Sequence, residues 1–374
     1  MTKRNRSKEI VEELLKKAGV AINGTNPWDI QVKDDRLYGR ILTQGSLGLG
    51  EAYMDGWWDA ERLDQFIDRV ISAGLANEIR KDLGTILKIA IAVLTNRQSK
   101  RRSFIVGQEH YDLGNDLYEN MLDKRLVYTC AYWKDVTTLD EAQEQKLDLV
   151  CKKLKLTPGM RVLDIGCGWG SFAKYAAETY GVSVVGITVS KEQVELAQEN
   201  CKGLPVEIRL QDYRDLNEKF DCIVSLGMFE HVGYRNYREY FRVASRCLDD
   251  NGLFLLHTIG DNQSSVHGEP WTEKYIFPNG MLPSISQIGK AIESQFVMED
   301  MHNFGAYYDK TLMAWYENFE RHWGKLEKKY GERFFRMWKY YLLSFAGSFR
   351  SRNIQLWQIV LSKKGIPGGY ESIR

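Results

Sequence analysis

Charge of one sign, paired cysteines and long apolar runs are all missing from this chain of 374 residues. The 51 Lys and Arg nearly balance the 50 Asp and Glu, and a net charge of +1 argues against nucleic-acid binding driven by bulk charge. No two cysteines form a Cys-x-x-Cys pair, so no metal site is expected. The six cysteines are Cys130, Cys151, Cys167, Cys201, Cys222 and Cys247.

The sequence also lacks a membrane span, since no run of about 18 apolar residues occurs. Its basic start leads into an amphipathic stretch instead of the apolar core of a signal peptide. We therefore expect a cytoplasmic protein with reduced thiols. No internal repeat or low-complexity tract is present.

The length exceeds what one typical core accommodates, so two domains are expected. A polar, basic segment at residues 96–103 marks the boundary. We predict a smaller, mainly helical N-terminal domain over 1–98, a linker over 99–106 and a second domain over 107–374.

Within the first domain, the apolar spacing of residues 9–18 predicts a helix. Residues 29–33 are compatible with a short strand. Residues 45–58 contain four glycines and predict a region rich in turns. Residues 61–95 have a helical pattern.

The second domain alternates strands and helices, which predicts an α/β fold with a doubly wound parallel sheet. Thr138 and Glu141 have capping-box spacing, so a helix should begin there. A further helix is expected over 171–180, and 355–362 is compatible with a late antiparallel strand. The parallel strands are expected over 162–165, 182–187, 206–210, 222–225 and 253–257.

A glycine loop follows the first of these strands. It has the form Asp164-x-Gly166-x-Gly168-x-Gly170. This is neither the Gly-x-Gly-x-x-Gly of dinucleotide-binding proteins nor a P-loop. It resembles motif I of S-adenosylmethionine-dependent methyltransferases, and the alternative is a glycine-rich turn in another α/β protein.

Polar residues also stand at the ends of the following strands, where such folds bind nucleotides. Thr188 and Gln193 can hydrogen-bond a cofactor, although Gln193 also completes a capping-box pattern with Ser190. Asp212 and Tyr213 suit an adenine, or belong to a surface loop. A buried Glu230 is costly without a partner, which favours a functional role.

Taken together, the motifs resemble the cyclopropane-fatty-acyl-phospholipid synthases of bacteria over nearly the whole chain. This resemblance implies a Rossmann-like class I methyltransferase domain with a mostly parallel, seven-stranded sheet, preceded by a domain for lipid binding or dimer contact. The matching segments are 45–58, 107–116, 128–133, 164–170, 228–231, 256–260, 274–280, 303–309 and 311–316.

The resemblance also implies a reaction. The methyl group of S-adenosylmethionine adds to a cis double bond of an unsaturated acyl chain in a membrane phospholipid. A carbocation forms, and loss of a proton to a bound bicarbonate closes the cyclopropane. The implied enzyme is a homodimer, peripheral on the inner face of the membrane.

Site residues follow from the matching motifs. The bicarbonate ligands implied are Cys130, Glu230, His257, Tyr308 and the backbone of Ile259. Each of these residues alone is compatible with a structural role. Beside an anion, Glu230 must either accept from a donor on bicarbonate or have a raised pKa, and the sequence leaves both open. The cofactor-binding residues implied are Tyr128, Thr129, Asp164, Gly166, Gly168, Gly170, Thr188, Gln193, Asp212 and Tyr213.

Two positions depart from the family. Thr129 replaces a common Ser, and residues 344–347 lack the cysteine found in many bacterial members, so a mechanism that needs that thiol cannot apply here. Two alternatives are a lipid methyltransferase that leaves a methyl branch or methylene, and a non-catalytic lipid- or nucleotide-binding protein.

A membrane contact is suggested by an apolar run at 86–94 that is followed by Arg97, Lys100, Arg101 and Arg102. Basic residues beside an apolar helix are typical of an interfacial anchor on anionic lipid. The alternative is a buried helix followed by a solvated linker.

Overall fold

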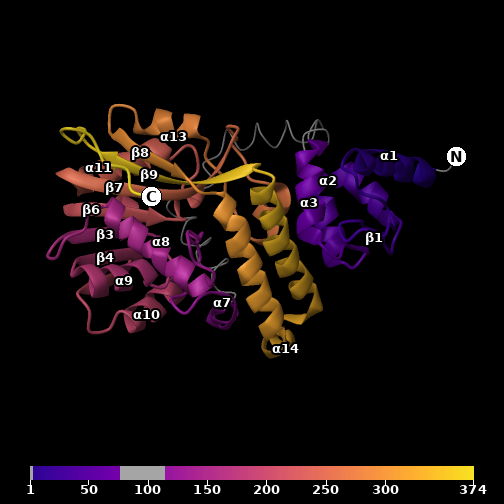
Figure 1. The fold of residues 1–374 in the computed structure, drawn as a ribbon, viewed down its shortest axis with the longest axis horizontal. Coiled ribbons are helices and arrows are strands. Elements are labelled where there is room, and N and C mark those ends of the chain that lie inside the picture. The colour runs from indigo at the N-terminus through magenta and orange to yellow at the C-terminus, as the bar shows by residue number, and fades with distance from the viewer. Residues whose placement is uncertain (1–2, 76–113) are drawn as a thin grey trace. The chain divides into compact units, whose positions relative to one another are not determined.

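The computed structural model describes residues 3–75 and 114–374 of the chain (Figure 1). The predicted linker at 99–106 and the apolar and basic segments at 86–102 lie outside these residues. The described residues form two compact units. One contains residues 3–75, His267–Pro278 and Tyr308–Ile354, and the other contains residues 114–266, Asn279–Tyr307 and Gln355–Arg374. The units are therefore not divided by a single cut in the sequence, and the boundary at 99–106 stays a prediction.

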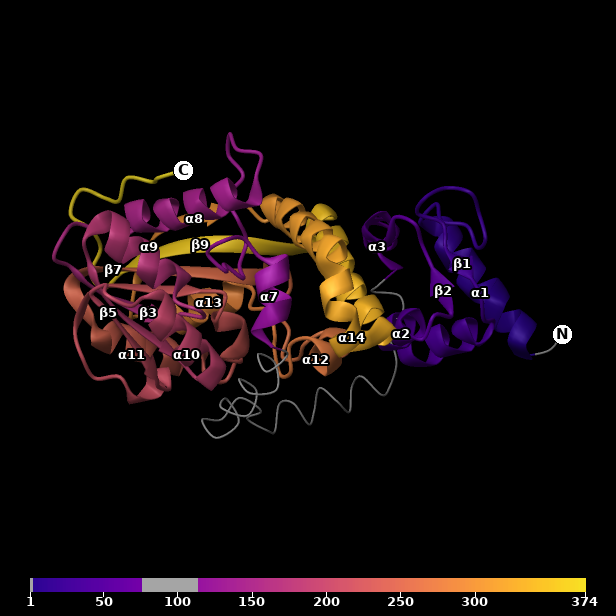
Figure 2. The same ribbon diagram turned by 90° about the horizontal axis from the view of Figure 1, so that it is seen from below.

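The second unit is built on a seven-stranded sheet with the order β5-β4-β3-β6-β7-β9-β8 (Figures 1 and 2). β3 pairs in parallel with both β4 and β6, and β6 pairs in parallel with β7. β8 and β9 are antiparallel. The predicted α/β fold class is confirmed. The strands are β3 (Arg161–Ile165), β4 (Ser183–Thr188), β5 (Val206–Leu210), β6 (Phe220–Leu226), β7 (Leu248–Asp261), β8 (Val297–Asn303) and β9 (Ile354–Ser362).

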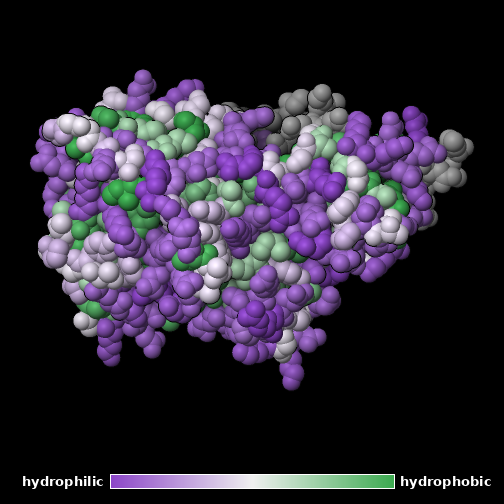
Figure 3. All heavy atoms as spheres, in the orientation of Figure 1, coloured by the Kyte–Doolittle hydropathy of each residue, from purple (hydrophilic) through white to green (hydrophobic). Residues whose placement is uncertain are grey.

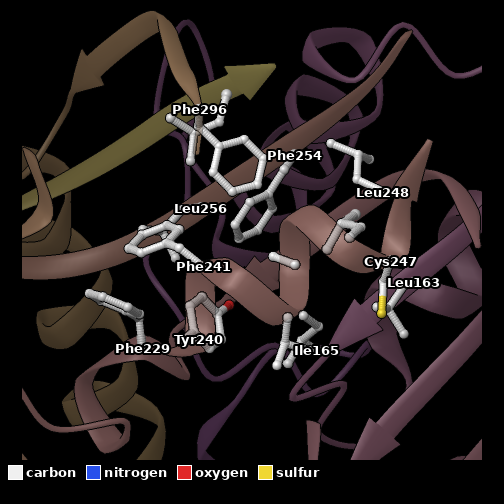
Figure 4. Close-up of a cluster of buried hydrophobic side chains, with 14 of the residues drawn as sticks. Leu163, Ile165, Phe229, Tyr240, Phe241, Cys247, Leu248, Phe254, Leu256 and Phe296 are labelled. Atoms are coloured by element: carbon white, nitrogen blue, oxygen red, sulfur yellow. The ribbon is translucent and has the colours of Figure 1, made fainter. Parts of the chain in front are cut away.

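Helices cover both faces of this sheet. Successive strand residues point to opposite sides, and both faces carry apolar side chains that the helices bury. Along β3, Val162 packs with α8 and α9 on one face. Leu163 and Ile165 pack with α11 and α13 on the other face (Figure 4). The helices are α7 (Asn115–Met121), α8 (Leu139–Lys153), α9 (Ser171–Tyr180), α10 (Lys191–Asn200), α11 (Tyr237–Cys247) and α13 (Ile285–Ile292), with 3₁₀ turns η1 (Tyr213–Asp215) and η2 (Phe229–His231).

The predicted start of α8 and the predicted bounds of α9 are confirmed in the second unit. Thr138 caps α8 in a complete capping box with Glu141, so the predicted helix start is confirmed. α9 begins at Ser171 and ends at Tyr180, with Gly181 in the left-handed conformation at its end.

The first unit is mainly helical. Its predicted helix at 9–18 lies mostly within α1, and the strand at 29–33 shrinks to two residues. The predicted helix at 61–95 is represented by α3, and its part beyond residue 75 lies outside the described residues. The elements are α1 (Lys3–Lys17), β1 (Gln31–Val32), α2 (Arg36–Met54), β2 (Trp58–Asp59), α3 (Leu63–Ser72), α12 (Pro270–Tyr275) and α14 (Ala306–Arg350), whose first two residues belong to the second unit.

The prediction of a turn-rich region over 45–58 is wrong for residues 46–54. These residues are helical, and only Gly45 departs from helical geometry, with φ 57°. The glycines at 48 and 50 serve close packing instead of a turn. A Cβ on Gly50 would lie 2.4 Å from Cδ1 of Trp271, and one on Gly48 would lie 2.5 Å from the carbonyl oxygen of Arg40.

None of the described helices is long and apolar enough to cross a membrane. On the face drawn in Figure 3, hydrophilic residues predominate over the described surface.

The packing of Gly50 predicts a stability difference between two glycines of one helix. Gly50→Ala should destabilise the protein by about 1–3 kcal/mol, because the new methyl group collides with Trp271. Gly39→Ala should stabilise it by up to about 1 kcal/mol, since no described atom lies within 4 Å of a Cβ there. Thermal unfolding of both variants measures this. Equal effects of the two substitutions would contradict the packing role.

Candidate active site

The glycine loop lies where the chain changes direction within the sheet. β3 pairs with β4 on one side and β6 on the other, so the loop after Ile165 is at the topological switch point, where open α/β sheets bind ligands. Gly166, Gly168 and Gly170 have φ of 85°, 54° and 82°, a region that favours glycine. A Cβ on Gly166 would meet Met228 at 2.7 Å, whereas one on Gly168 would meet no described atom within 4 Å. The backbone at Gly168 is therefore open to a close-lying ligand.

Asp164 is buried at the end of β3, just before this loop. Its Oδ2 has no hydrogen-bond partner among the described residues. Burial raises its pKa to about 7, against a smaller lowering by the charge of Lys146. A donor group on a ligand would satisfy this oxygen.

Thr188 and Gln193 come together after β4. The Thr188 hydroxyl donates to Oε1 of Gln193 at 2.7 Å. The Ser190 side chain caps α10 by accepting from the Gln193 amide at 3.3 Å. The side chain of Gln193 thus turns toward Thr188, and the Ser190 half of the capping box forms in this turn.

Asp212 and Tyr213 follow β5. The Asp212 carboxylate accepts from Nε and Nη2 of Arg214 at 2.8 and 2.7 Å. The Tyr213 ring lies edge-on to Tyr240, with centroids 5.2 Å apart. Because Asp212 already has a cationic partner, its contact with an adenine stays a prediction.

One segment contains Tyr128, Thr129 and Cys130, and side chains of α8 hydrogen-bond to it. Nε2 of Gln143 donates to the Thr129 carbonyl at 2.8 Å, and Nζ of Lys146 donates to the Thr129 hydroxyl at 2.8 Å. Cys130 is fully buried. The Thr129 methyl group lies beside the end of β6, since a Cβ on Gly227 would be 2.6 Å from it.

Sequence reasoning missed the two supporting residues on α8. Gln143, Lys146, Val150 and Lys153 recur at helical spacing and are all buried. This spacing places them on the apolar side of the helix, which is the signal that could have identified them.

Glu230, His257 and Ile259 meet at the ends of β6 and β7. Leu226, the last residue of β6, pairs with His257 on β7. Four residues after Leu226, in the turn that follows β6, Oε1 of Glu230 accepts from the Ile259 amide at 2.7 Å. Oε2 of Glu230 and Nε2 of His257 are both buried and have no hydrogen-bond partner within the described part of the chain.

Burial shifts the pKa values of Glu230 and His257 in the directions that favour their neutral forms. It raises the pKa of Glu230 to about 7, despite the Ile259 hydrogen bond that lowers it. Burial also lowers the pKa of His257 well below its ordinary range, and the charges of Lys146 and Lys153 add to this. The site therefore holds a neutral imidazole and a carboxyl group that titrates near neutral pH.

Gln358 on β9 orients the imidazole, and the sequence analysis missed it. It is fully buried, and its Nε2 lies 3.3 Å from Nδ1 of His257. In this orientation of the amide, its nitrogen donates and Nδ1 accepts, which assigns the proton of the neutral ring to Nε2. His257 thus presents an N–H donor to the site.

Tyr308 belongs to the first unit, near the start of α14. Its ring stacks on Phe349 with centroids 4.5 Å apart, and the neighbouring Asp309 accepts from Nε of Arg350 at 2.9 Å. Its predicted contact with bicarbonate stays a prediction.

The sheet order, the glycine loop and the polar strand ends define the class of S-adenosylmethionine-dependent methyltransferases. The chain belongs to the mycolic acid cyclopropane synthetase family, whose model matches residues 98–359. The cyclopropane-fatty-acyl-phospholipid synthase of Escherichia coli (strain K12) is 57% identical to it over 365 residues, covering 98% of this chain and 95% of that protein. A probable fatty acid methyltransferase of Pseudomonas putida is 33% identical, covering 91% and 89%.

Solved structures show the same relationship. The cyclopropane synthase MmaA2 from Mycobacterium tuberculosis has a TM-score of 0.65 and 32% identity, covering 70% of this chain and 98% of that one. The mycolic acid cyclopropane synthase CmaA1, complexed with SAH and CTAB, has a TM-score of 0.65 and 34% identity with the same coverage.

The buried carboxyl group predicts a pH-dependent stability difference. The pKa of Glu230 in the folded protein is about 7, above its ordinary 4.5, so the folded state holds this proton more tightly than the unfolded state. The contribution of Glu230 to stability is present at low pH and is lost as pH rises toward 7. Glu230→Gln should therefore be more stable than the parent at pH 8, by roughly 3 kcal/mol, and equally stable near about pH 4.

Denaturant unfolding at the two pH values measures this difference. Glu195→Gln, on the exposed face of α10, is the control and should behave like the parent throughout. A Glu230→Gln protein with no advantage at pH 8 would contradict the burial argument.

The contact with Gln358 predicts the tautomer of His257. In ¹⁵N NMR of histidine-labelled protein, His257 should show a protonated Nε2 and an unprotonated Nδ1. Gln358→Leu removes the donor and should shift the population toward Nδ1–H. Gln355→Leu, on the same strand, should leave the His257 signals in place because Gln355 bonds to Asn303. An unchanged tautomer in Gln358→Leu would refute the assignment.

Proposed function

We propose that this methyltransferase transfers a methylene group from S-adenosylmethionine to the cis double bond of unsaturated acyl chains in membrane phospholipids, with a bound bicarbonate as base. The observation that carries the proposal is the pair of buried atoms without partners, Oε2 of Glu230 and Nε2 of His257, at the ends of neighbouring strands. Such atoms are costly unless a ligand satisfies them.

These atoms fit a small oxyanion that also carries a hydroxyl. The N–H of His257 would donate to one of its oxygens, and an ionised Oε2 of Glu230 would accept from its hydroxyl. The backbone amide of Ile259 is occupied by Glu230, so this residue acts on the anion through that carboxylate or through its carbonyl. Cys130 and Tyr308 complete the proposed ligand set.

The residues around the glycine loop fit a nucleoside cofactor. Gly168 allows close backbone approach, Asp164 offers an unpartnered oxygen, and Thr188 with Gln193 offers hydrogen-bonding groups at the end of β4. Tyr128, Thr129, Asp212 and Tyr213 are proposed to line the same site. When bound, S-adenosylmethionine supplies an electrophilic methyl group, and bicarbonate supplies a base.

The residues of the chain exclude water and hold protons in this proposal. An alkene is a weak nucleophile, so competing water must be kept out and the reacting atoms must be aligned. Cys130 is fully buried, and His257 and Glu230 are 1% and 8% exposed. His257 keeps its proton on Nε2, where it orients an anion.

The lipid substrate, peripheral membrane association and a homodimer belong to the same proposal. They are supported by the name of the Escherichia coli relative and by the matching motifs along the chain. A second candidate is a methyltransferase that leaves a branch, because relatives about a third identical to this chain are named fatty acid or sphingolipid methyltransferases.

Incubation with S-adenosylmethionine and vesicles of unsaturated phospholipid tests the function. We expect the acyl chains to gain the mass of one CH₂ group and to lose the reactivity of the alkene. Glu230→Gln should lower turnover by roughly 100-fold or more while SAH affinity stays nearly unchanged, because the carboxylate acts on the reaction and not on cofactor binding.

The products distinguish the alternatives. The same mass gain with an alkene still reactive indicates a methylene branch or a methyl group on a retained double bond, because a saturated methyl branch needs a reductant that this assay does not contain. If the acyl chains gain no mass although the protein still binds SAH, the result favours a non-catalytic binding protein. Full turnover by Glu230→Gln would remove this residue from the proposed base site.

A further inference from the structure

The side chain of Lys146 carries a buried ammonium group next to the segment that contains Thr129 and Cys130. Its side chain is fully buried on α8, and its Nζ donates to the Thr129 hydroxyl at 2.8 Å. No carboxylate among the described residues forms an ion pair with it. By contrast, Lys153, two turns further along α8, lies 3.9 Å from Oδ2 of Asp300.

Burying an unpaired charge costs folding free energy. If the charge of Lys146 had no role, an apolar residue of similar size would cost the protein little stability at this position. Burial lowers the pKa of Lys146 only to about 8. The group therefore keeps its proton at neutral pH.

The charge of Lys146 acts on the residues of the site. It lowers the pKa of Asp164 and of His257, and it interacts with Cys130 and Asp123. Asp123 is itself held by the Val127 amide, at 2.8 Å, and burial raises its pKa to about 6. None of these four groups neutralises Lys146 by direct contact.

The methyl donor adds a second positive charge, because S-adenosylmethionine is a sulfonium. Two cations in one buried site repel each other unless an anion lies between or beside them. The site residues that interact with Lys146 include Cys130 and His257, which are proposed ligands of bicarbonate.

We propose that Lys146 is the buried counter-charge for the bicarbonate anion and the positioning residue for Thr129. This inference rests on the proposed function. Lys146 attracts the anion through its charge, whereas Glu230 and His257 recognise its hydrogen-bonding groups. No side chain other than Lys146 combines full burial, a contact with the 127–130 segment and an unpaired positive charge in the described part of the chain.

Calorimetric titration with sodium bicarbonate at constant ionic strength tests this role in the full-length protein. Lys146→Met should raise the dissociation constant of bicarbonate by about tenfold or more, and Lys146→Arg should retain most of the affinity. Lys153→Met is the matched control, a buried lysine of the same helix that has a carboxylate nearby and acts less on His257 than Lys146 does, so it should raise the dissociation constant of bicarbonate less.

SAH affinity and the thermal midpoint, measured on the same samples, separate this role from a structural one. A selective loss of bicarbonate affinity in Lys146→Met supports the inference. Equal bicarbonate affinity in Lys146→Met and the parent, or an equal loss in Lys153→Met, overturns it. A parent that binds SAH but no bicarbonate overturns the proposed base itself.

A competition experiment on the parent decides the matter if Lys146→Met does not fold. Nitrate is a planar monoanion without a hydroxyl group. A buried counter-charge should let nitrate displace bicarbonate, because attraction by charge does not need the hydroxyl. An ionised Oε2 of Glu230 opposes an anion that has no hydroxyl, so the titration is repeated on Glu230→Gln. Nitrate binding to either protein supports the counter-charge, and failure of nitrate to bind both proteins refutes the inference.

Discussion

The hydrogen bond from the Ile259 amide to Oε1 of Glu230 is the constraint on which the proposed site depends. It joins the turn after β6 to β7, at the edge where the parallel strands end. It also leaves Oε2 buried without a partner among the described residues, which raises the pKa of the carboxyl group to about 7. The register of β6 and β7 brings His257 opposite the end of β6, so one pairing of strands places both groups.

A helix on one face of the sheet supports this edge. α8 packs Leu147 and Val150 into the core, as an amphipathic helix should. On the same side it carries Gln143 and Lys146, which hold the Thr129 backbone and hydroxyl. The polar residues are tolerated in the core because each has a partner in the segment that they position.

Local signals predicted the elements well where the physical cause is local. The capping box at Thr138 forms as expected because side chains a few residues apart satisfy the backbone. The glycine loop after Ile165 has the positive φ angles that glycine allows. The region over 45–58 was mispredicted because a glycine can serve either a turn or a close packing contact, and the sequence pattern does not distinguish the two. At Gly50 it allows contact with Trp271, which is 221 positions away, so no local pattern reveals the need for it.

The sequence by itself determined the α/β class, the glycine loop, and the identity of Glu230 and His257 as site candidates, because these depend on periodicity, on short-range geometry and on motifs that resemble a family. Only the tertiary structure decided that the carboxyl group titrates near neutral pH, and that Gln358 places the proton of His257 on Nε2. It also decided that Lys146 is buried without an ion pair in the described chain. Burial and long-range contacts set pKa values and tautomers, and neither is a property of neighbouring residues in the sequence.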